Sequence, residues 1–114
     1  IIPIVAYVTN RPVEVKKGTQ KWLIKHGFPT LPILGRPKYV DRYTTNIWKA
    51  EMLNFLYPFI DGYVDDNYEV LDYLPKTYKG HYFLFDMAKH DSPIKNVYPC
   101  PNWPSVFKKV KEIY

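Results

Sequence analysis

Apolar and polar residues alternate in blocks along this chain of 114 residues. Short continuous apolar runs, rich in β-branched and aromatic residues, predict buried strands. The runs are IIPIVAYV, which ends at Thr9, then LPILG, IDGYV and HYFLF. Between them, apolar residues recur at steps of three and four, which is typical of helices packed on one face. The predicted helices are VEVKKGTQKWLIKHGF, IWKAEMLNFLY, YEVLDYL and a last one after a proline-rich loop.

Polar, proline and glycine residues set the expected boundaries of these elements. Pro12 suits a first helical turn, and Gly27 suits a helix end. Thr44 or Thr45 and later Asn67 have side chains that can cap helices.

Strands that alternate with helices predict an α/β fold, a three-layer Rossmann-like parallel sheet with helices on both faces. The last helix has an apolar face of Trp103, Val106, Phe107, Val110, Ile113 and Tyr114.

The length and composition fit one compact domain over residues 1–114, with 46% hydrophobic and 18% aromatic residues. The formal net charge is +5, which is compatible with an anionic ligand or partner. The densest basic cluster is Lys108, Lys109 and Lys111, which we expect on the solvent side of the last helix.

A single cysteine, Cys100, excludes a disulfide within the chain and a zinc site built from paired cysteines. We therefore expect a reducing, cytoplasmic location. No apolar run approaches the ~20 residues of a membrane span, so no membrane partner is expected. The sequence opens at Ile1, within an apolar run, and this suggests a segment of something longer.

Candidate ligand-binding residues lie near the ends of the predicted strands, where ligands bind in open parallel sheets. Thr9, with Asn10 and Arg11, ends the first strand, and Asp65 and Asp66 end the third. Lys49 is expected in the first turn of the second helix. A hydroxyl donor and a cation suit the oxygens of a phosphoryl group, and carboxylates suit Mg²⁺. Taken singly, each of these residues has an ordinary use in a turn, at a cap or on a solvated surface.

In this order the segments resemble the C-terminal part of a phosphatase of the haloacid dehalogenase superfamily. VTNRP, followed by TQKWL and HGFP, resembles the family's second motif. The resemblance implies that Thr9 binds the phosphoryl group and that Asn10 lends a backbone N–H. Arg11 follows them and is either an anion contact or a surface charge.

The third and fourth motifs have counterparts too. NIWKAEM resembles the third, which makes Lys49 the lysine that neutralises the phosphoryl group. DGYVDDN resembles the fourth, which makes Asp65 and Asp66 the Mg²⁺ ligands, and YFLFD resembles the strand that follows it. The resemblance implies a Mg²⁺-dependent phosphate-ester hydrolase that acts on a phosphorylated small molecule or the end of a nucleic acid.

The family's first motif, Asp-x-Asp-x-Thr, has no counterpart, since the chain contains no Asp-x-Asp pair. In the family this strand carries the nucleophile and lies between the strands that end here at Thr9 and Asp65. Asp86 in FLFDMA could mimic it, but Ala88 stands where the second aspartate belongs. We therefore expect the chain to be inactive alone. An N-terminal segment or a second chain would complete the sheet, and association of copies by strand exchange is one solution.

Two other functions are open. One is a non-enzymatic module of the same fold that binds a phosphorylated ligand, a nucleic acid or a protein partner. The other is nucleic-acid binding through a basic, tyrosine-rich surface such as KYVDRY, although we expect most tyrosines to serve in packing. His26, His81 and His90 lack the spacing of metal ligands, and His26 is expected to be half-buried on its helix.

Overall fold

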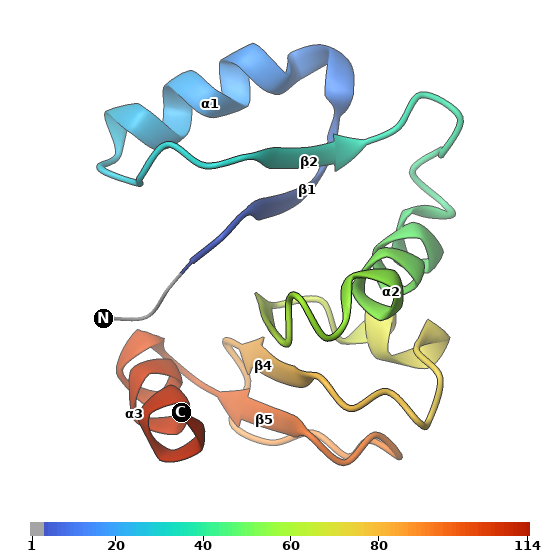
Figure 1. Ribbon diagram of the computed structural model, residues 1–114, viewed down its shortest axis with the longest axis vertical. Helices are drawn as coiled ribbons and strands as arrows, with labels where there is room; N and C mark the ends of the chain where they lie inside the picture. Colours follow the sequence, from blue (N-terminus) through green and yellow to red (C-terminus); the bar gives the residue numbers. More distant parts are fainter. Residues whose placement is uncertain (1–3) are drawn as a thin grey trace. The chain divides into compact units, whose positions relative to one another are not determined.

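The computed structural model describes residues 4–114, with the backbone but not the side chains of Asn10, Pro12 and Val13. It confirms an α/β chain with parallel strands (Figure 1). The elements in chain order are β1 (Tyr7–Pro12), η1 (Val13–Val15), α1 (Lys16–Lys25), β2 (Ile33–Arg36), α2 (Thr45–Leu56), β3 (Gly62–Asp65), η2 (Tyr68–Tyr73), β4 (His81–Phe85), β5 (Val97–Cys100) and α3 (Trp103–Ile113). The η elements are short 3₁₀ helices.

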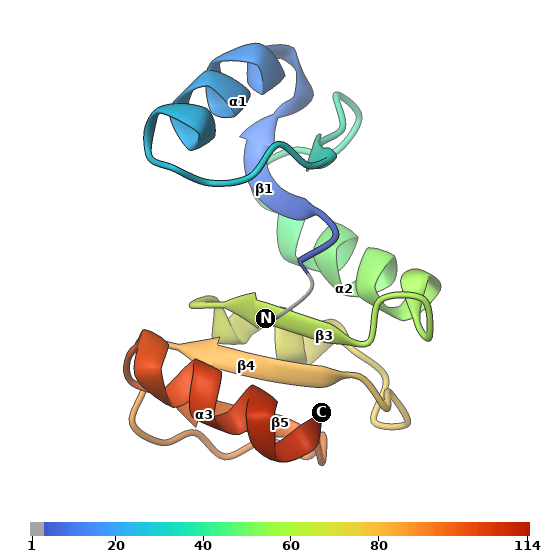
Figure 2. The same ribbon diagram turned by 60° about the vertical axis from the view of Figure 1, so that its left-hand side comes forward.

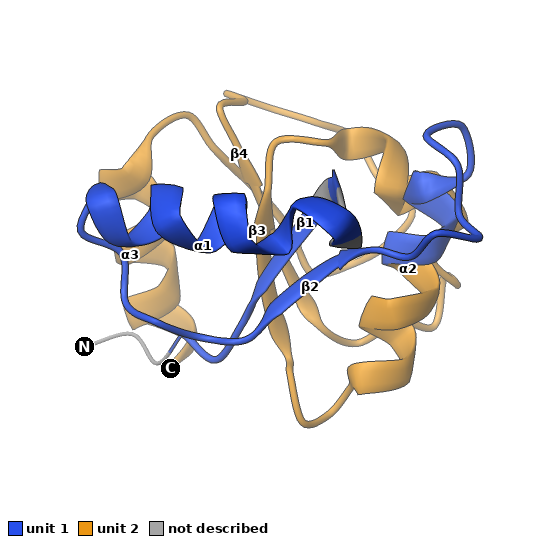
Figure 3. Ribbon diagram, turned by 90° about the horizontal axis from the view of Figure 1, so that it is seen from above, with its two compact units in different colours: residues 1–49 blue, residues 50–114 orange. Residues whose placement is uncertain are grey.

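The chain divides into two compact units, Ile1–Lys49 and Ala50–Tyr114, coloured separately in Figure 3. The division falls within α2, so the first residues of this helix belong to one unit and the rest to the other. Each unit has a parallel sheet of its own. The expectation of one domain over the whole chain stays a prediction.

In the first unit β1 and β2 form a parallel pair, and α1 runs alongside them (Figure 1). Val8 lies opposite Leu34 and Pro12 lies opposite Arg36. Three residues of β1 therefore span the single Gly35 of β2, so the end of β1 bulges out of the ladder. Bulges of this kind re-aim side chains, often beside functional sites.

The prediction of a buried strand over IIPIVAYV is wrong in two respects. The described part of β1 begins at Tyr7, because pairing with β2 begins at Tyr7 and Ile33. Ile4 and Val5 precede the strand and are exposed. Residues 1–3 of the predicted strand lie outside the described residues. Pro12 closes β1 and does not begin a helix.

The first helix, which the sequence predicts to pack on one face, is also only partly buried. Thr19 is buried, but Trp22 and His26 are exposed, which corrects the expectation that His26 is half-buried. The His26 ring stacks on Trp22 with centroids 4.2 Å apart, on the outside of the helix. Gly27 ends the turn with a φ of 81°, a conformation that glycine adopts without strain, as predicted.

In the second unit the strand order is β3-β4-β5, all parallel, and helical residues pack on both faces. Successive residues of β4 point to opposite faces. Tyr82 and Leu84 join a core with Ala50 and Leu53 of α2 and with residues of η2. Phe83 faces the other way and packs against Val106. Figure 2 shows α3, the helix that contains Val106, alongside β4 and β5.

β5 was not predicted, because it lies inside the stretch expected to be a proline-rich loop. Cys100 pairs with Phe85, and Pro99 lies opposite Leu84. Proline lacks the N–H that a central strand needs, but β5 is an edge strand with β4 as its hydrogen-bonded neighbour in the sheet.

The last helix agrees with its prediction in position but only in part in burial. Val106 is buried, whereas Trp103 and Phe107 remain half exposed. Lys108 and Lys111 are exposed, as expected for a solvent-facing basic cluster. Lys109 is only half-buried, and its ammonium lies 3.3 Å from the carboxylate of Glu112.

Candidate functional site

Thr9, the predicted phosphate-binding hydroxyl, lies in the bulge at the end of β1 and is half-buried. Its Oγ1 accepts a hydrogen bond of 3.1 Å from the backbone N–H of Arg11. This bond folds the end of the strand back on the threonine. It leaves the hydroxyl proton of Thr9 able to donate, because the oxygen is the acceptor in this contact.

The neighbours of Thr9 are only partly described. The side chain of Asn10 lies outside the described residues, and its predicted role as a backbone donor stays a prediction. Arg11 has an exposed side chain. An exposed guanidinium at the carboxyl end of a strand is compatible with an anion contact as well as with a surface charge.

Lys49, the predicted neutralising lysine, is the fifth residue of α2 and is only 5% exposed. Lysine is almost never this buried unless its ammonium has partners. The expectation of an ordinary solvated lysine therefore does not hold. A buried ammonium is the kind of group that binds an anion strongly, since little water competes for it.

Asp65 and Asp66 follow one another at the end of β3, and Asp65 is half-buried. Tyr63 donates its hydroxyl to Oδ2 of Asp65 at 2.7 Å. The backbone N–H of Asn67 donates to Oδ1 at 3.2 Å. Asn67 in turn caps η2 as predicted, because its side chain accepts the N–H of Glu69 at 3.0 Å. The acidic turn is thus held by hydrogen bonds on both sides.

Two buried tyrosines, Tyr63 and Tyr82, support this turn, and neither was predicted as a site residue. Tyr82 of β4 donates its hydroxyl to the carbonyl oxygen of Asn67 at 2.7 Å. Its ring lies 5.3 Å from that of Tyr63, centroid to centroid. Burial, and then the charge of Asp65, raise the pKa of both tyrosines, so each remains a neutral donor. The signal in the sequence is a tyrosine within each apolar strand, since a buried hydroxyl needs a partner.

The acidic turn fits Mg²⁺ as a partial site. Mg²⁺ is bound in proteins by one or two carboxylates together with waters and phosphate oxygens. Asp65 and Asp66 supply two carboxylates, and the hydrogen bonds from Tyr63 and Asn67 hold that of Asp65 in place. Within residues 4–114, no three His, Cys, Asp or Glu side chains gather as a complete cage. The ligand's phosphate would have to complete the coordination.

The predicted convergence of all four residues is not decided by these positions. Thr9 and Lys49 belong to the first unit, whereas Asp65 and Asp66 belong to the second. Each side of the site is built locally, one by a bulge and a helix and the other by a strand and a capped turn. Their meeting at one phosphoryl group stays a prediction.

The histidines have structural contacts. His26 Nδ1 lies 2.8 Å from the carbonyl oxygen of Trp22, and His81 Nδ1 lies 2.9 Å from the hydroxyl of Tyr98. His90 lies against the ring of Tyr68, with centroids 5.7 Å apart. Asp86 follows β4 as a turn residue with a φ of 63°, and its N–H donates to the carbonyl oxygen of Cys100 at 2.8 Å.

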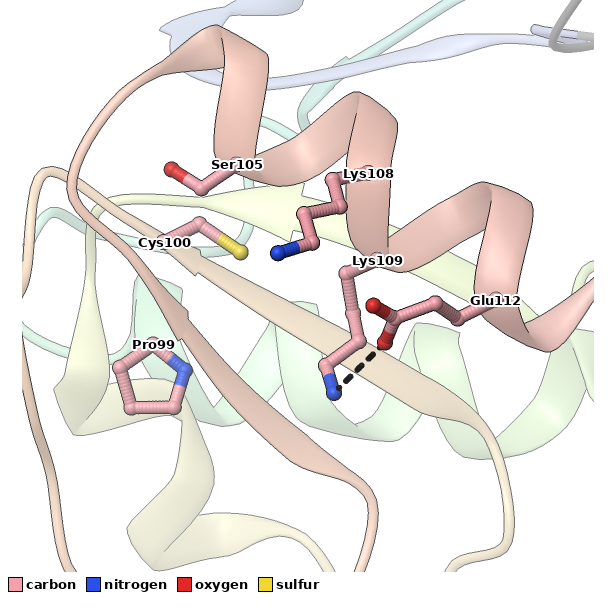
Figure 4. A pocket seen from close by; sticks show the side chains of 6 residues that line it. All are labelled: Pro99, Cys100, Ser105, Lys108, Lys109 and Glu112. Atoms are coloured by element: carbon pink, nitrogen blue, oxygen red, sulfur yellow. Dashed lines mark hydrogen bonds and ion pairs between the residues drawn. The ribbon is translucent and has the colours of Figure 1, made fainter.

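Two cavities lie in the second unit. One of about 180 Å³ between β5 and α3 contains the thiol of Cys100 and the ammonium groups of Lys108 and Lys109 (Figure 4). Burial raises the pKa of this thiol, which disfavours the thiolate needed for nucleophilic chemistry. The other, of about 320 Å³, is lined by residues of η2 and of the segment from His90 to Pro93. Neither contains a predicted site residue.

Comparison with known proteins finds no matching family model, no matching curated protein and no matching solved structure. In the part of the chain that the structure describes, no helix has the length and apolar character to cross a bilayer.

Proposed function

We propose that this chain is the C-terminal part of a Mg²⁺-dependent phosphate-ester hydrolase of the haloacid dehalogenase type, with the three-layer Rossmann-like fold of that superfamily. It supplies Thr9, Lys49, Asp65 and Asp66, and it is inactive until a strand with the nucleophile joins it. That strand comes from an N-terminal segment or from a second chain. A reducing cytoplasm suits the single buried Cys100.

One observation carries this proposal. The strands that end at the two halves of the predicted site, β1 and β3, each occupy an edge of a separate parallel sheet. These are the two strands that would flank a missing nucleophile strand. An edge strand has backbone groups directed away from its one neighbour, and an added strand can pair with them.

The chemistry assigns a role to each residue. The hydroxyl of Thr9 donates a hydrogen bond to a phosphoryl oxygen, and Lys49 neutralises charge on the phosphoryl group and the nucleophile. Asp65 and Asp66 hold Mg²⁺, which neutralises further charge when bound. The aspartate of the added strand attacks phosphorus, and the ester oxygen leaves with its bonding electrons. Water then cleaves the acyl phosphate and releases inorganic phosphate.

A second function has support of its own. The chain contains no Asp-x-Asp pair, and Asp65 already accepts hydrogen bonds from Tyr63 and Asn67. Such a turn is stable without a metal. A non-enzymatic module that binds a phosphorylated ligand or a partner would keep these features.

The test begins with the gene upstream of the codon for Ile1. We expect an Asp-x-Asp-x-Thr motif within about 20–60 residues, room for one strand and a short insertion. A protein extended to include it should hydrolyse an aryl phosphate with Mg²⁺, and Asp65→Asn and Lys49→Met should each lower the rate by a factor of about 100 or more. Asp72→Asn, at an exposed position on η2, is the matched control and should retain the rate.

Two results would overturn the proposal. If the 114-residue chain alone turned over the substrate and Asp65→Asn abolished this activity, the account of the missing nucleophile would be wrong. An upstream sequence without the motif, or an extended protein without turnover, would favour the binding module.

A further inference from the structure

We infer that residues 37–44, the loop between β2 and α2, form a contact surface for single-stranded nucleic acid. The consequence that the substrate is a phosphorylated strand end rests on the proposed function. The contact surface itself does not, because binding needs neither the nucleophile nor Mg²⁺.

The first half of the 37–44 loop is anchored to the first unit. Val40 is only 7% exposed, and its N–H donates to the carbonyl oxygen of Pro37 at 3.0 Å. Its own carbonyl oxygen accepts a hydrogen bond of 2.7 Å from Nη1 of Arg36, the last residue of β2. One buried side chain and two hydrogen bonds therefore define the conformation of this half.

Asp41 organises the second half. Its Oδ1 accepts the backbone N–H of Tyr43 at 2.8 Å and that of Thr44 at 2.9 Å. These two bonds lower the pKa of the Asp41 carboxyl group, so it stays ionised at neutral pH. The 37–44 loop is thus built by its own side chains and leads directly into α2.

Two aromatic rings of this ordered loop are exposed to solvent. Tyr39 is 87% exposed and Tyr43 is 78% exposed. The guanidinium of Arg42 lies 5.0 Å from the centroid of the Tyr43 ring and donates to the Tyr43 hydroxyl at 2.9 Å. Exposed rings beside a cation contribute little to the packing of the fold. They are the elements with which proteins bind single strands, because bases stack on the rings and phosphates meet the charges.

The distribution of charge points to the same ligand. Residues 1–49 carry nine lysines and arginines against two acidic residues, a formal charge of +7. Residues 50–114 carry seven against nine, a formal charge of −2. The net charge of the chain therefore understates how basic the first unit is. Such asymmetry between the halves of a chain is typical of contact with a polyanion.

The 37–44 loop also lies at the chemically relevant edge of its sheet. β1 and β2 are parallel, and Pro12 lies opposite Arg36, so both strands end at the same edge. The exposed Arg11 follows Thr9 at that edge. The 37–44 loop follows Arg36 directly, so it leaves the sheet at the same edge as the end of β1 that carries the predicted phosphate-binding hydroxyl of Thr9.

The test is binding of a fluorescein-labelled oligothymidylate of about ten nucleotides, within the span that one compact domain covers. Fluorescence anisotropy with the 114-residue chain should show saturable binding. Tyr39→Ala and Tyr43→Ala should each weaken it about fivefold or more, and Tyr→Phe at either position should retain it, since stacking needs only the ring. Tyr73→Ala, at a half-exposed tyrosine of the second unit, is the control and should leave the affinity unchanged. Circular dichroism checks that each variant is folded.

The salt dependence of the affinity distinguishes the contribution of the charges from that of the rings. Arg42→Gln should lower the slope of log affinity against log salt by about 0.7, the value for one phosphate contact on a single strand. The alanine variants should leave that slope nearly unchanged. Binding that is equally tight to a duplex and insensitive to Tyr39→Ala and Tyr43→Ala would overturn the inference. So would binding of anionic phosphatidylserine vesicles in place of the oligonucleotide.

The outcome is separable from that of the proposed function. If the extended protein hydrolyses an aryl phosphate but the chain does not bind the oligonucleotide, only the inference about the 37–44 loop fails. If the chain binds through Tyr39 and Tyr43 but the extended protein has no phosphatase activity, the contact surface stands and the strand end is no longer a substrate.

Discussion

Gly80 precedes β4 at a point where the core leaves no room for a side chain. A β-carbon there would overlap the ring and hydroxyl of Tyr78. Tyr78 is buried in the main core of the second unit, where its ring packs edge-on against Tyr57. The glycine therefore serves close packing, since its φ is not in the left-handed region.

Gly80→Ala should destabilise the second unit. The added methyl must displace a buried aromatic ring, and overpacking of this kind costs about 1–3 kcal/mol. Urea denaturation followed by circular dichroism measures the change in the free energy of unfolding.

Gly18→Ala is the matched control. Gly18 lies within α1, and a β-carbon there would meet no atom within 4 Å. Alanine should stabilise the helix by up to about 1 kcal/mol. Equal effects of the two substitutions would contradict the packing account of Gly80.

At the scale of elements, α3 has the best defined start. The Asn102 side chain accepts the N–H of Ser105 at 3.0 Å, and Ser105 Oγ accepts the N–H of Asn102 at 3.2 Å. This reciprocal capping box directs Val106 into the core against Phe83. It satisfies N–H groups that the first turn of a helix cannot pair.

We expect Asn102→Ala to lower the free energy of unfolding by about 1 kcal/mol, because one backbone donor loses its acceptor. Asn102→Asp keeps the acceptor oxygen and should be nearly neutral. Thermal or urea denaturation of the three proteins gives the comparison. An alanine variant as stable as the parent would show that α3 is held by packing alone.

Local signals predicted these elements well where each has its own boundary residues. Gly27 and Asn67 act at the helix ends where the sequence places them. The predictions from sequence failed where pairing with a neighbouring strand decides the structure. β5 contains Pro99 and becomes a strand only because β4 offers it an edge. The apolar residues Ile4 and Val5 stay exposed because the pairing with β2 begins after them.

At the scale of the whole molecule, the candidate site shows the same limit. Thr9, Lys49, Asp65 and Asp66 could be selected from residue types at strand and helix ends. The buried tyrosine that supports the acidic turn could not, since Tyr82 is 15 residues from Asn67 in sequence. Such a contact depends on the register of β3 and β4, in which Tyr63 pairs with Tyr82. A sequence pattern does not contain that register.

The same tyrosines make the stability of the molecule depend on pH. Burial is the main cause that raises the pKa of Tyr78 to about 12 and raises those of Tyr63 and Tyr82 as well. In the unfolded chain a tyrosine loses its proton near pH 10. Above that pH the unfolded state binds fewer protons than the folded state, so the free energy of unfolding must fall as the pH rises.

Between pH 10 and about 12, each of these tyrosines should contribute a fall of up to ~1.4 kcal/mol per pH unit, and below about pH 9 their contribution should be flat. Urea denaturation at a series of pH values measures the slope. Tyr82→Phe removes one of the buried hydroxyls and should make the slope shallower by one proton, whereas Tyr73→Phe, at a half-exposed position, should leave it unchanged. If Tyr82→Phe kept the parent's slope, the hydroxyl that donates to Asn67 would not be protonated in the folded state, and the support that we assign to the acidic turn would be wrong.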